Sequence, residues 1–212
     1  HIPTWSREAR AGEYGKEEMN KIVGNRRELY RILEPYDAHL CTAHEHYAEN
    51  YELSDSLFEH VHAPLSGLFW QSLWSMDGVP WGYYVYTIKN GDISWYYKAV
   101  GQDKSVQYTE YAVGEDRHKP DCIVANVWNY DPKWQVLWYE DGVLQGEMTK
   151  FSGWDTTICN DVDQRREKEF RWKYIGAGET QHLFYAKPSR PDAKVQIQVI
   201  DRFGNVCKPY RN

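Results

Sequence analysis

The sequence predicts a mixed α+β chain, in which an α/β segment at residues 1–113 is followed by an antiparallel β-sandwich at residues 114–212. Apolar residues recur with helical spacing from Lys16 to Leu33, and a short strand pattern follows them. After Asn50, short β-prone runs alternate with turn signals about every ten residues, as in small sandwiches. The 10 Trp, 17 Tyr and 6 Phe make up 16% of the chain, which excludes a disordered polypeptide.

Charge and cysteine spacing exclude several classes of function. The net charge of −6 argues against nucleic acid or an anionic membrane surface as the main partner, because both attract basic patches. No apolar run reaches the roughly 18–20 residues of a membrane span. No two cysteines form a Cys-x-x-Cys pair, which excludes a zinc ribbon or a thioredoxin-type site and leaves both free thiols and two disulfides open. The cysteines are Cys41, Cys122, Cys159 and Cys207.

The N-terminal segment is predicted to place polar residues at the end of a strand. The helix predicted over residues 16–33 ends before Pro35, since proline disfavours the helical region for the residue before it. Residues 36–41 then predict a strand that leads directly into Thr42-Ala43-His44-Glu45-His46. In α/β sheets the carboxyl ends of strands carry the chemistry, so this stretch is the first place to look for a site.

The remaining elements are predicted as strands on either side of a linker. The first set covers residues 57–62, 67–74, 81–89, 93–100 and 106–113, with Asn90-Gly91 predicting a tight hairpin turn. The polar stretch Gly114–Pro120 is the predicted boundary between the two domains. The second set covers residues 122–128, 134–139, 143–148, 182–186 and 195–201, and residues 202–205 predict a turn. Residues 161–173 are expected to form a short helix or an ordered loop.

Histidines are the densest group of candidate functional residues. His44 and His46 are two residues apart, and whether they follow the strand in extended or loop form their imidazoles can converge on neighbouring metal ions. Neutral imidazoles suit Zn, Mn and Fe. His60 and His62 have the same spacing, while His39 lies inside a predicted strand. The competing interpretation is that each pair is solvated or hydrogen-bonded and binds no metal.

The order of these motifs resembles one enzyme family. His-Ile-Pro at residues 1–3, an amphipathic helix, and a strand ending in Ala43-His44-Glu45-His46 resemble the last two metal motifs of the calcineurin-like metallophosphoesterases, although alanine replaces the usual glycine. Residues 59–70, 77–78 and 93–98 resemble a bacterial, Bacteroidetes-type subgroup that carries an appended C-terminal domain. Residues 126–129, 138–142 and 201–204 resemble that domain.

The resemblance implies a metal-dependent phosphoesterase that hydrolyses a phosphate mono- or diester. His1 and His44 would bind one divalent ion and His46 a second, and both ions would be Mn, Fe or Zn. Together the two ions would activate a bridging water and bind the phosphoryl oxygens of the substrate. His60 and His62 lie beyond the motif and are expected to be structural. The family's other motifs precede the His-Ile-Pro strand, so we expect the upstream half of the phosphoesterase domain as a partner and this chain alone to be inactive. The resemblance also favours a periplasmic or extracellular location.

The aromatic content supports an alternative without catalysis. Tryptophans on a sandwich face stack against sugar rings, so residues 114–212 could form a carbohydrate- or partner-binding module. The four candidates are Trp128, Trp134, Trp138 and Trp154. Core packing is the competing explanation for Trp128 and Trp138, which lie within strand patterns among alternating apolar residues. No Gly-x-Ser-x-Gly motif and no Gly-x-x-x-x-Gly-Lys loop occurs in the chain.

Overall fold

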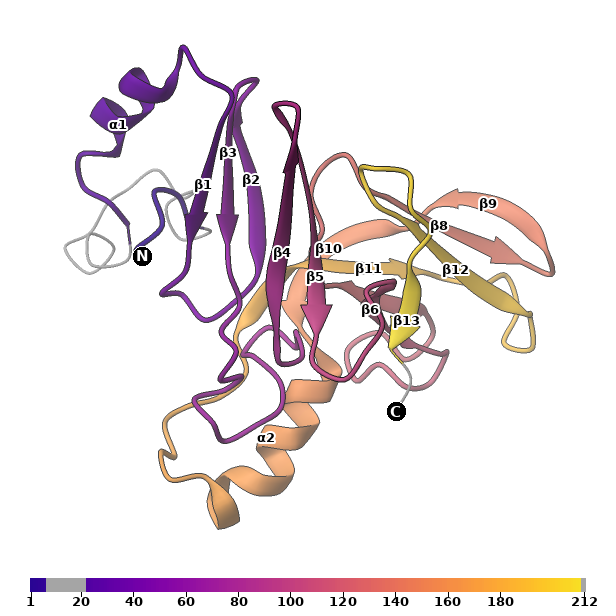
Figure 1. Ribbon diagram of the computed structural model, residues 1–212. Helices are drawn as coiled ribbons and strands as arrows, with labels where there is room; N and C mark the ends of the chain where they lie inside the picture. Colours follow the sequence, from indigo (N-terminus) through magenta and orange to yellow (C-terminus); the bar gives the residue numbers. More distant parts are fainter. Residues whose placement is uncertain (7–21, 211–212) are drawn as a thin grey trace.

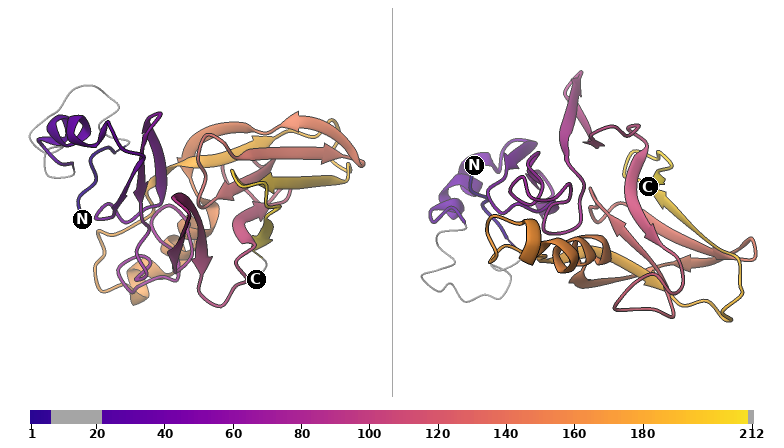
Figure 2. Two further views of the ribbon diagram at one scale, coloured as in Figure 1. Left: turned by 45° about the horizontal axis from the view of Figure 1, so that its top comes forward. Right: turned by 90° about the horizontal axis from the view of Figure 1, so that it is seen from below.

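The computed structural model describes residues 1–6 and 22–210, and these residues form a fold dominated by β-strands (Figure 1). They contain two helices and thirteen strands in four sheets. The sheet of β1, β2 and β3 lies at one end of the molecule and the sheet of β8, β9 and β12 at the other (Figures 1 and 2). A mixed, β-rich fold is therefore confirmed. No helix among the described residues is long and apolar enough to cross a membrane.

The N-terminal sheet has the strand order β1-β3-β2. β1 (Ala38–Thr42) runs parallel to β3 (Leu57–Val61), and β2 (Glu49–Ser54) runs antiparallel to β3. The parallel pair and the preceding helix α1 (Arg26–Leu33) agree with an α/β segment. The strand β2 is not among the predicted elements.

The predicted helix at residues 16–33 is wrong at residues 22–25, which are not helical in the structure. α1 begins only at Arg26, after a turn that contains Gly24 and Asn25. Glycine and asparagine favour turns over helix interiors. The backbone N–H of Val23 donates instead to the carbonyl oxygen of Pro3, at 2.9 Å. Residues 16–21 of the prediction lie outside the described part of the chain.

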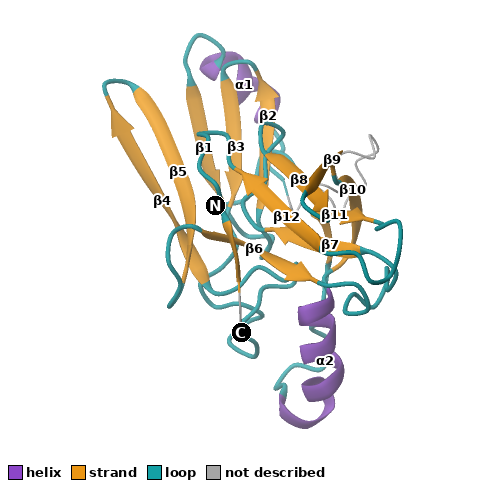
Figure 3. Cartoon of the chain, turned by 90° about the vertical axis from the view of Figure 1, so that its right-hand side faces the viewer, coloured by secondary structure: helices purple, strands orange, loops and turns teal. Residues whose placement is uncertain are grey.

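A two-stranded hairpin stands beside the N-terminal sheet (Figure 3). It consists of β4 (Gly82–Lys89) and β5 (Asp92–Ala99). Asn90 and Gly91 have φ angles of +54° and +90°, the left-handed pair that a tight type I′ turn requires. The predicted Asn-Gly hairpin is therefore confirmed.

The strand predicted at residues 67–74 is wrong, because this stretch is a series of turns in the loop between β3 and β4. Gly67, Phe69 and Trp70 all have left-handed φ angles, which an extended strand does not allow. The N–H of Trp70 closes a turn on the carbonyl oxygen of Ser66, at 2.7 Å. The run is rich in strand-forming aromatic residues, but its turns and tertiary contacts override that propensity.

Two antiparallel-rich sheets form the rest of the chain. One has the order β10-β11-β7-β6-β13 and the other the order β12-β8-β9. The first comprises β6 (Val106–Tyr111), β7 (Ile123–Val127), β10 (Thr149–Trp154), β11 (Glu179–Ala186) and β13 (Lys208–Tyr210). The second comprises β8 (Gln135–Glu140), β9 (Val143–Glu147) and β12 (Val195–Ile200). β10 and β13 are not among the predicted strands.

One hydrophobic cluster contains side chains from both of these sheets. Ile123 and Phe184 come from the five-stranded sheet, and Val136 and Val199 from the three-stranded sheet. The predicted boundary at residue 114 falls between β6 and β7, which are hydrogen-bonded neighbours. The division into two domains and the sandwich arrangement both stay predictions.

Helix α2 (Thr156–Glu169) covers the loop between β3 and β4. It begins where the Asp155 carboxylate accepts a hydrogen bond from the N–H of Ile158, at 3.1 Å, so it starts earlier than the predicted residue 161. Its buried Ile158 and Val162 pack with Leu68 and Trp74 of that loop. The helical alternative for the charged stretch is thereby confirmed, and α2 fixes the loop against the five-stranded sheet.

A buried polar network joins α2, the five-stranded sheet and the loop before β4. The Asp155 carboxylate accepts hydrogen bonds from the hydroxyl of Tyr111, at 2.7 Å, and from Nδ2 of Asn126, at 2.8 Å. Asn126 Nδ2 also donates to the backbone oxygen of Asp77, and Asn126 Oδ1 lies 2.6 Å from Nδ1 of His182. Because these side chains are buried and paired, the network fixes the relative positions of the three elements.

Candidate metal-ligating histidines

The loop after β1 brings the first two predicted ligands together. β1 ends at Thr42, and the N–H of Ala43 donates to the carbonyl oxygen of His1, at 2.8 Å. The rings of His1 and His44 meet edge to face, with 5.2 Å between their centroids. Residue 1 and residue 44 are thus neighbours although 43 positions separate them.

A buried glutamate holds the N-terminal segment in this place. Glu59 on β3 is fully buried, and its carboxylate accepts hydrogen bonds from both the N–H and the hydroxyl of Thr4, at 2.7 and 2.6 Å. The Thr42 hydroxyl donates to the same carboxylate at 2.9 Å. Burial raises the pKa of Glu59, and the hydrogen bonds from Thr4 and Thr42 oppose that rise. Glu59 therefore ties the segment that begins at His1 to the end of β1.

His44 and His46 both have left-handed backbone conformations. Their φ angles are +75° and +60°, in a bend between β1 and β2. A non-glycine residue in this region costs free energy, of order 1–3 kcal/mol, and such residues concentrate at functional sites. Of the two geometries open to the His-x-His pair, the structure has the loop.

His46 presents a ring nitrogen that has no partner among the described residues. Its ring is half-buried and stacks on Phe69, with 4.2 Å between centroids, and its Nδ1 is buried without a hydrogen bond. Burial and, to a smaller extent, the nearby charge of His44 lower the pKa of His46. The neutral imidazole that results is the form that binds metal ions.

The assignment of His1, His44 and His46 as metal ligands stays a prediction. The described residues contain no group of three or more His, Cys, Asp or Glu arranged to hold a metal ion. His1 and His44 are in ring contact, but the part of the chain that the structure describes brings no third ligand-type side chain to them in a metal-binding arrangement. A metal bound here needs further ligands from elsewhere.

Three of the other histidines, His39, His60 and His62, form a separate hydrogen-bonded group in which His60 is buried and the other two are half-buried. His39 Nδ1 lies 2.9 Å from His60 Nε2, His60 Nδ1 lies 3.0 Å from Asn50 Oδ1, and His62 Nε2 lies 2.6 Å from the Tyr86 hydroxyl. Burial lowers the pKa of His60 to about 2 and that of His62 to about 4. Both imidazoles are therefore neutral at physiological pH and satisfied by protein partners, as expected for structural histidines.

The tryptophans considered for sugar binding are mostly part of the core. Trp128 and Trp134 are buried, and Trp138 is half-buried against the cluster between the two C-terminal sheets. The Trp128 indole N–H donates to the Thr109 hydroxyl inside the protein. Only Trp154 of the four is exposed, so these residues do not form a continuous stacking surface.

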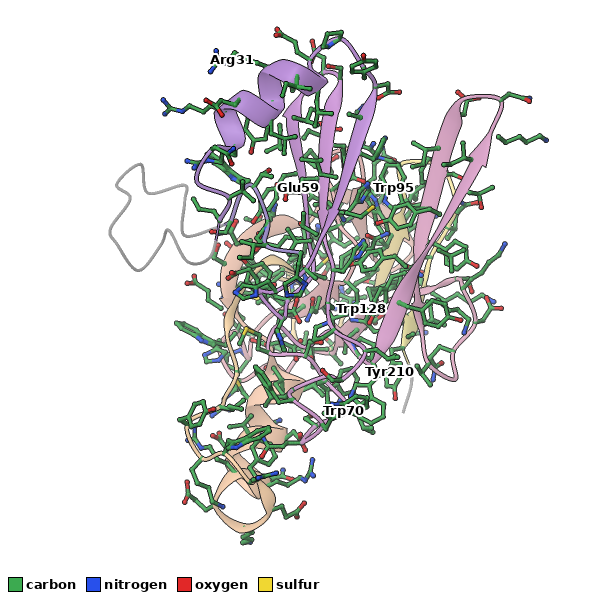
Figure 4. The ribbon with its side chains drawn as sticks, turned by 60° about the vertical axis from the view of Figure 1, so that its left-hand side comes forward. Arg31, Glu59, Trp70, Trp95, Trp128 and Tyr210 are labelled. Carbon is green, nitrogen blue, oxygen red and sulfur yellow. The ribbon has the colours of Figure 1, made fainter. Side chains whose placement is uncertain are left out.

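Sequence reasoning missed a different aromatic group, next to His46. The Phe69 ring stacks on His46 on one side and meets Trp172 edge to face, with centroids 6.3 Å apart. Trp70 lies on the same loop beside α2 (Figure 4) and is 70% exposed. The available signal is the aromatic run Phe69-Trp70, which lies within the stretch 67–74 that the sequence predicts as a strand.

Comparison with known proteins identifies most of the chain. The family model of the C-terminal of calcineurin-like phosphoesterase matches residues 59–207. The match begins at Glu59, so His1, His44 and His46 precede it. No curated protein and no solved structure matches the chain.

Proposed function

We propose that the chain contributes the last histidine ligands to the dinuclear metal site of a phosphoesterase, because it belongs to the family of C-terminal domains of calcineurin-like phosphoesterases. The family is generally metal-dependent, and a C-terminal domain of this kind implies an upstream catalytic domain as its partner. The observation that carries the proposal is the ring contact of His1 and His44 in the loop after β1, together with the buried Nδ1 of His46, two residues further on, which has no hydrogen-bond partner among the described residues.

The chemistry of these residues suits the proposed ions. Imidazole nitrogens are common ligands for Mn, Fe and Zn, and a buried nitrogen without a hydrogen bond is a group that a bound cation would satisfy. His1 and His44 would hold one ion and His46 the other. When bound, the ions supply a water of lowered pKa and polarise the phosphoryl oxygens.

The chain's own contribution is to fix these imidazoles in place. Phe69 stacks on His46 and sets the plane of its ring, while the hydrogen bond from Ala43 to the carbonyl oxygen of His1 sets the position of residue 1. Glu59 anchors the same segment through Thr4. Ligands held this firmly lose little conformational entropy on metal binding, which favours a preorganised site.

The free edge of the N-terminal sheet supports the proposed upstream partner. Within the described residues, β1 pairs with β3 on one side and with no strand on the other. An open strand edge presents unpaired N–H and C=O groups, which natural proteins usually cover. We expect the upstream part of the phosphoesterase domain to pair with this edge, beside the histidines, and to provide the carboxylate ligands.

Hydrolysis by the full-length protein tests the proposal. His44→Ala and His46→Ala are each expected to lower metal-dependent hydrolysis of p-nitrophenyl phosphate and bis-p-nitrophenyl phosphate by more than about 100-fold, because each removes a direct ligand. His118→Ala is the matched control, since His118 is exposed and lies outside this loop. Undiminished turnover in the His44 and His46 variants, or no hydrolysis by the wild type, would contradict the proposal.

Three finer points are proposed on the same basis. The isolated chain should hydrolyse neither ester, because its described residues contain no group of three or more side chains arranged to hold a metal ion. The bacterial subgroup and a periplasmic or extracellular location follow from the resemblance of residues 59–70 and 93–98. Assays of the isolated chain and fractionation of its native host would check these points.

A further inference from the structure

Four aromatic residues with left-handed backbone conformations lie close together in the described part of the chain. Six described non-glycine residues have positive φ angles, and two of them, Asn90 and Asp141, precede glycine in hairpin turns where such angles are usual. The remaining four are His44, His46, Phe69 and Trp70. Because His46 stacks directly on Phe69, the two strained pairs lie side by side. Strain in bulky residues persists where the surrounding structure enforces it, and it concentrates at ligand sites.

Phe69 and Trp70 form one wall of an open groove of about 470 Å³. The opposite wall comes from the end of α2 and the residues that follow, including Trp172. The backbone N–H of Trp172 donates to Oε1 of Gln71, at 2.9 Å, so a hydrogen bond joins the two walls. Trp70 is 70% exposed and Trp172 36% exposed, which leaves indole surface open to solvent inside the groove.

The groove also holds a guanidinium that lies over one of its indole rings. The Arg171 guanidinium lies over the Trp172 ring, 5.3 Å from its centroid, and forms no ion pair with any described residue. The other arginine of the groove, Arg165, is engaged by Asp161 and Glu169. Stacked on an indole, a planar guanidinium extends the flat surface that a ring system can contact.

We infer that this groove binds the ester group of the substrate, and that this group is a planar ring system which stacks on Trp70 and Trp172. The inference rests on the proposed function, because it places the phosphoryl group at His46. Only the Phe69 ring separates His46 from Trp172, so a ligand that spans the two positions is the size of one ring and its phosphate. Exposed indoles favour flat, apolar partners over aliphatic ones, since every planar π-system offers a stacking face.

Selective loss of ring-bearing substrates tests the inference in the full-length, metal-loaded protein. Trp70→Ala is expected to lower kcat/KM for 1-naphthyl phosphate about tenfold, mainly through KM, and to change that for cyclohexyl phosphate less than about twofold. Comparing each substrate with itself removes the difference in intrinsic reactivity. Trp154→Ala is the control, since Trp154 is another exposed tryptophan at the opposite end of α2. Equal losses of kcat/KM for the two esters would overturn the inference. No loss for either ester would also overturn it, and that is the result expected if the upstream domain covers the groove.

Calorimetric binding separates this inference from the proposed function. 1-Naphthyl phosphate is expected to bind to the wild type and to lose about tenfold in affinity in Trp70→Ala, whether or not the protein hydrolyses it. Binding without hydrolysis would support the groove and contradict the phosphoesterase proposal. Hydrolysis of the ester with equal binding to the wild type and to Trp70→Ala would support the phosphoesterase proposal and contradict the groove.

Discussion

Asp155 should make the protein less stable as the pH rises through the range from 4 to 6. Its carboxyl is fully buried at the start of α2, and burial raises its pKa from 3.8 to about 6 although Tyr111, Asn126 and Ile158 donate hydrogen bonds to it. The folded state then binds a proton more tightly than the unfolded state. The stabilisation is fully present below pH 3.8 and is lost as the pH rises through about 6.

The size of this effect follows from the two pKa values. A change from 3.8 to about 6 corresponds to about 3 kcal/mol of unfolding free energy in total, of which about 2 kcal/mol falls between pH 4 and pH 8. Asp155→Asn removes the titration and keeps a side chain of the same shape. The stability advantage of the wild type over the variant should therefore shrink by about 2 kcal/mol across that interval.

Urea unfolding followed by tryptophan fluorescence, at pH values from 4 to 8, measures this difference. The comparison between wild type and Asp155→Asn cancels the titration of groups that the two proteins share. A difference that stays constant with pH would show that the Asp155 pKa is unshifted. A difference that grows with pH would show that the hydrogen bonds outweigh burial, and would refute the reasoning.

Two further predictions concern packing and thiol chemistry. Gly78→Ala should destabilise the fold by at least about 3 kcal/mol, because Gly78 has a φ of +79° and an added Cβ would overlap the Asp155 carboxyl group. Gly114→Ala is the control in chemical denaturation, because φ is +94° there but the added methyl group meets no atom within 4 Å. We expect this variant to lose only about 1–2 kcal/mol of unfolding free energy. Equal losses in the two variants would contradict the clash at Gly78. All four cysteines are free, and Cys41 is exposed whereas Cys207 is buried with its pKa raised to about 12. Iodoacetamide at pH 8 should therefore label Cys41 in the folded protein and Cys207 only after unfolding, as read by peptide mass spectrometry; early labelling of Cys207 would be inconsistent with its burial.

Local signals in the sequence were enough to predict the hairpin and several strands. Asn90-Gly91 specifies its turn through backbone conformations that few other residue pairs adopt. The alternation of Val195, Ile197 and Val199 predicts one buried face, and these side chains do pack against the shared cluster of the C-terminal sheets. Both signals lie within a few neighbouring residues, where sequence patterns are most informative.

Elements that depend on distant contacts could not be predicted in the same way. β13 pairs in parallel with β6, about 100 positions earlier, and contains Pro209, which disfavours a strand assignment. The stretch at residues 67–74 has strand-like composition, but it turns where the Trp81 indole N–H donates to the carbonyl oxygen of Ser72 across Gly67. Helix α1 is shorter than its pattern because Val23 pairs with Pro3.

The candidate site was predicted in part. The motif identified His1, His44 and His46, and the structure brings His1 and His44 into ring contact, which the distance along the chain does not reveal. The aromatic residues around His46 were missed because Phe69 and Trp172 come from a loop and from the segment after α2. Their meeting depends on how α2 packs on that loop, a long-range contact that no local pattern encodes.

The metal content of the full-length protein tests the central claim most directly. Elemental analysis after purification in the presence of Mn, Fe or Zn is expected to give two divalent ions per chain for the wild type and about one for each of His44→Ala and His46→Ala, with His118→Ala unchanged. Two ions retained in both the His44 and the His46 variants would contradict the assignment of these histidines as ligands.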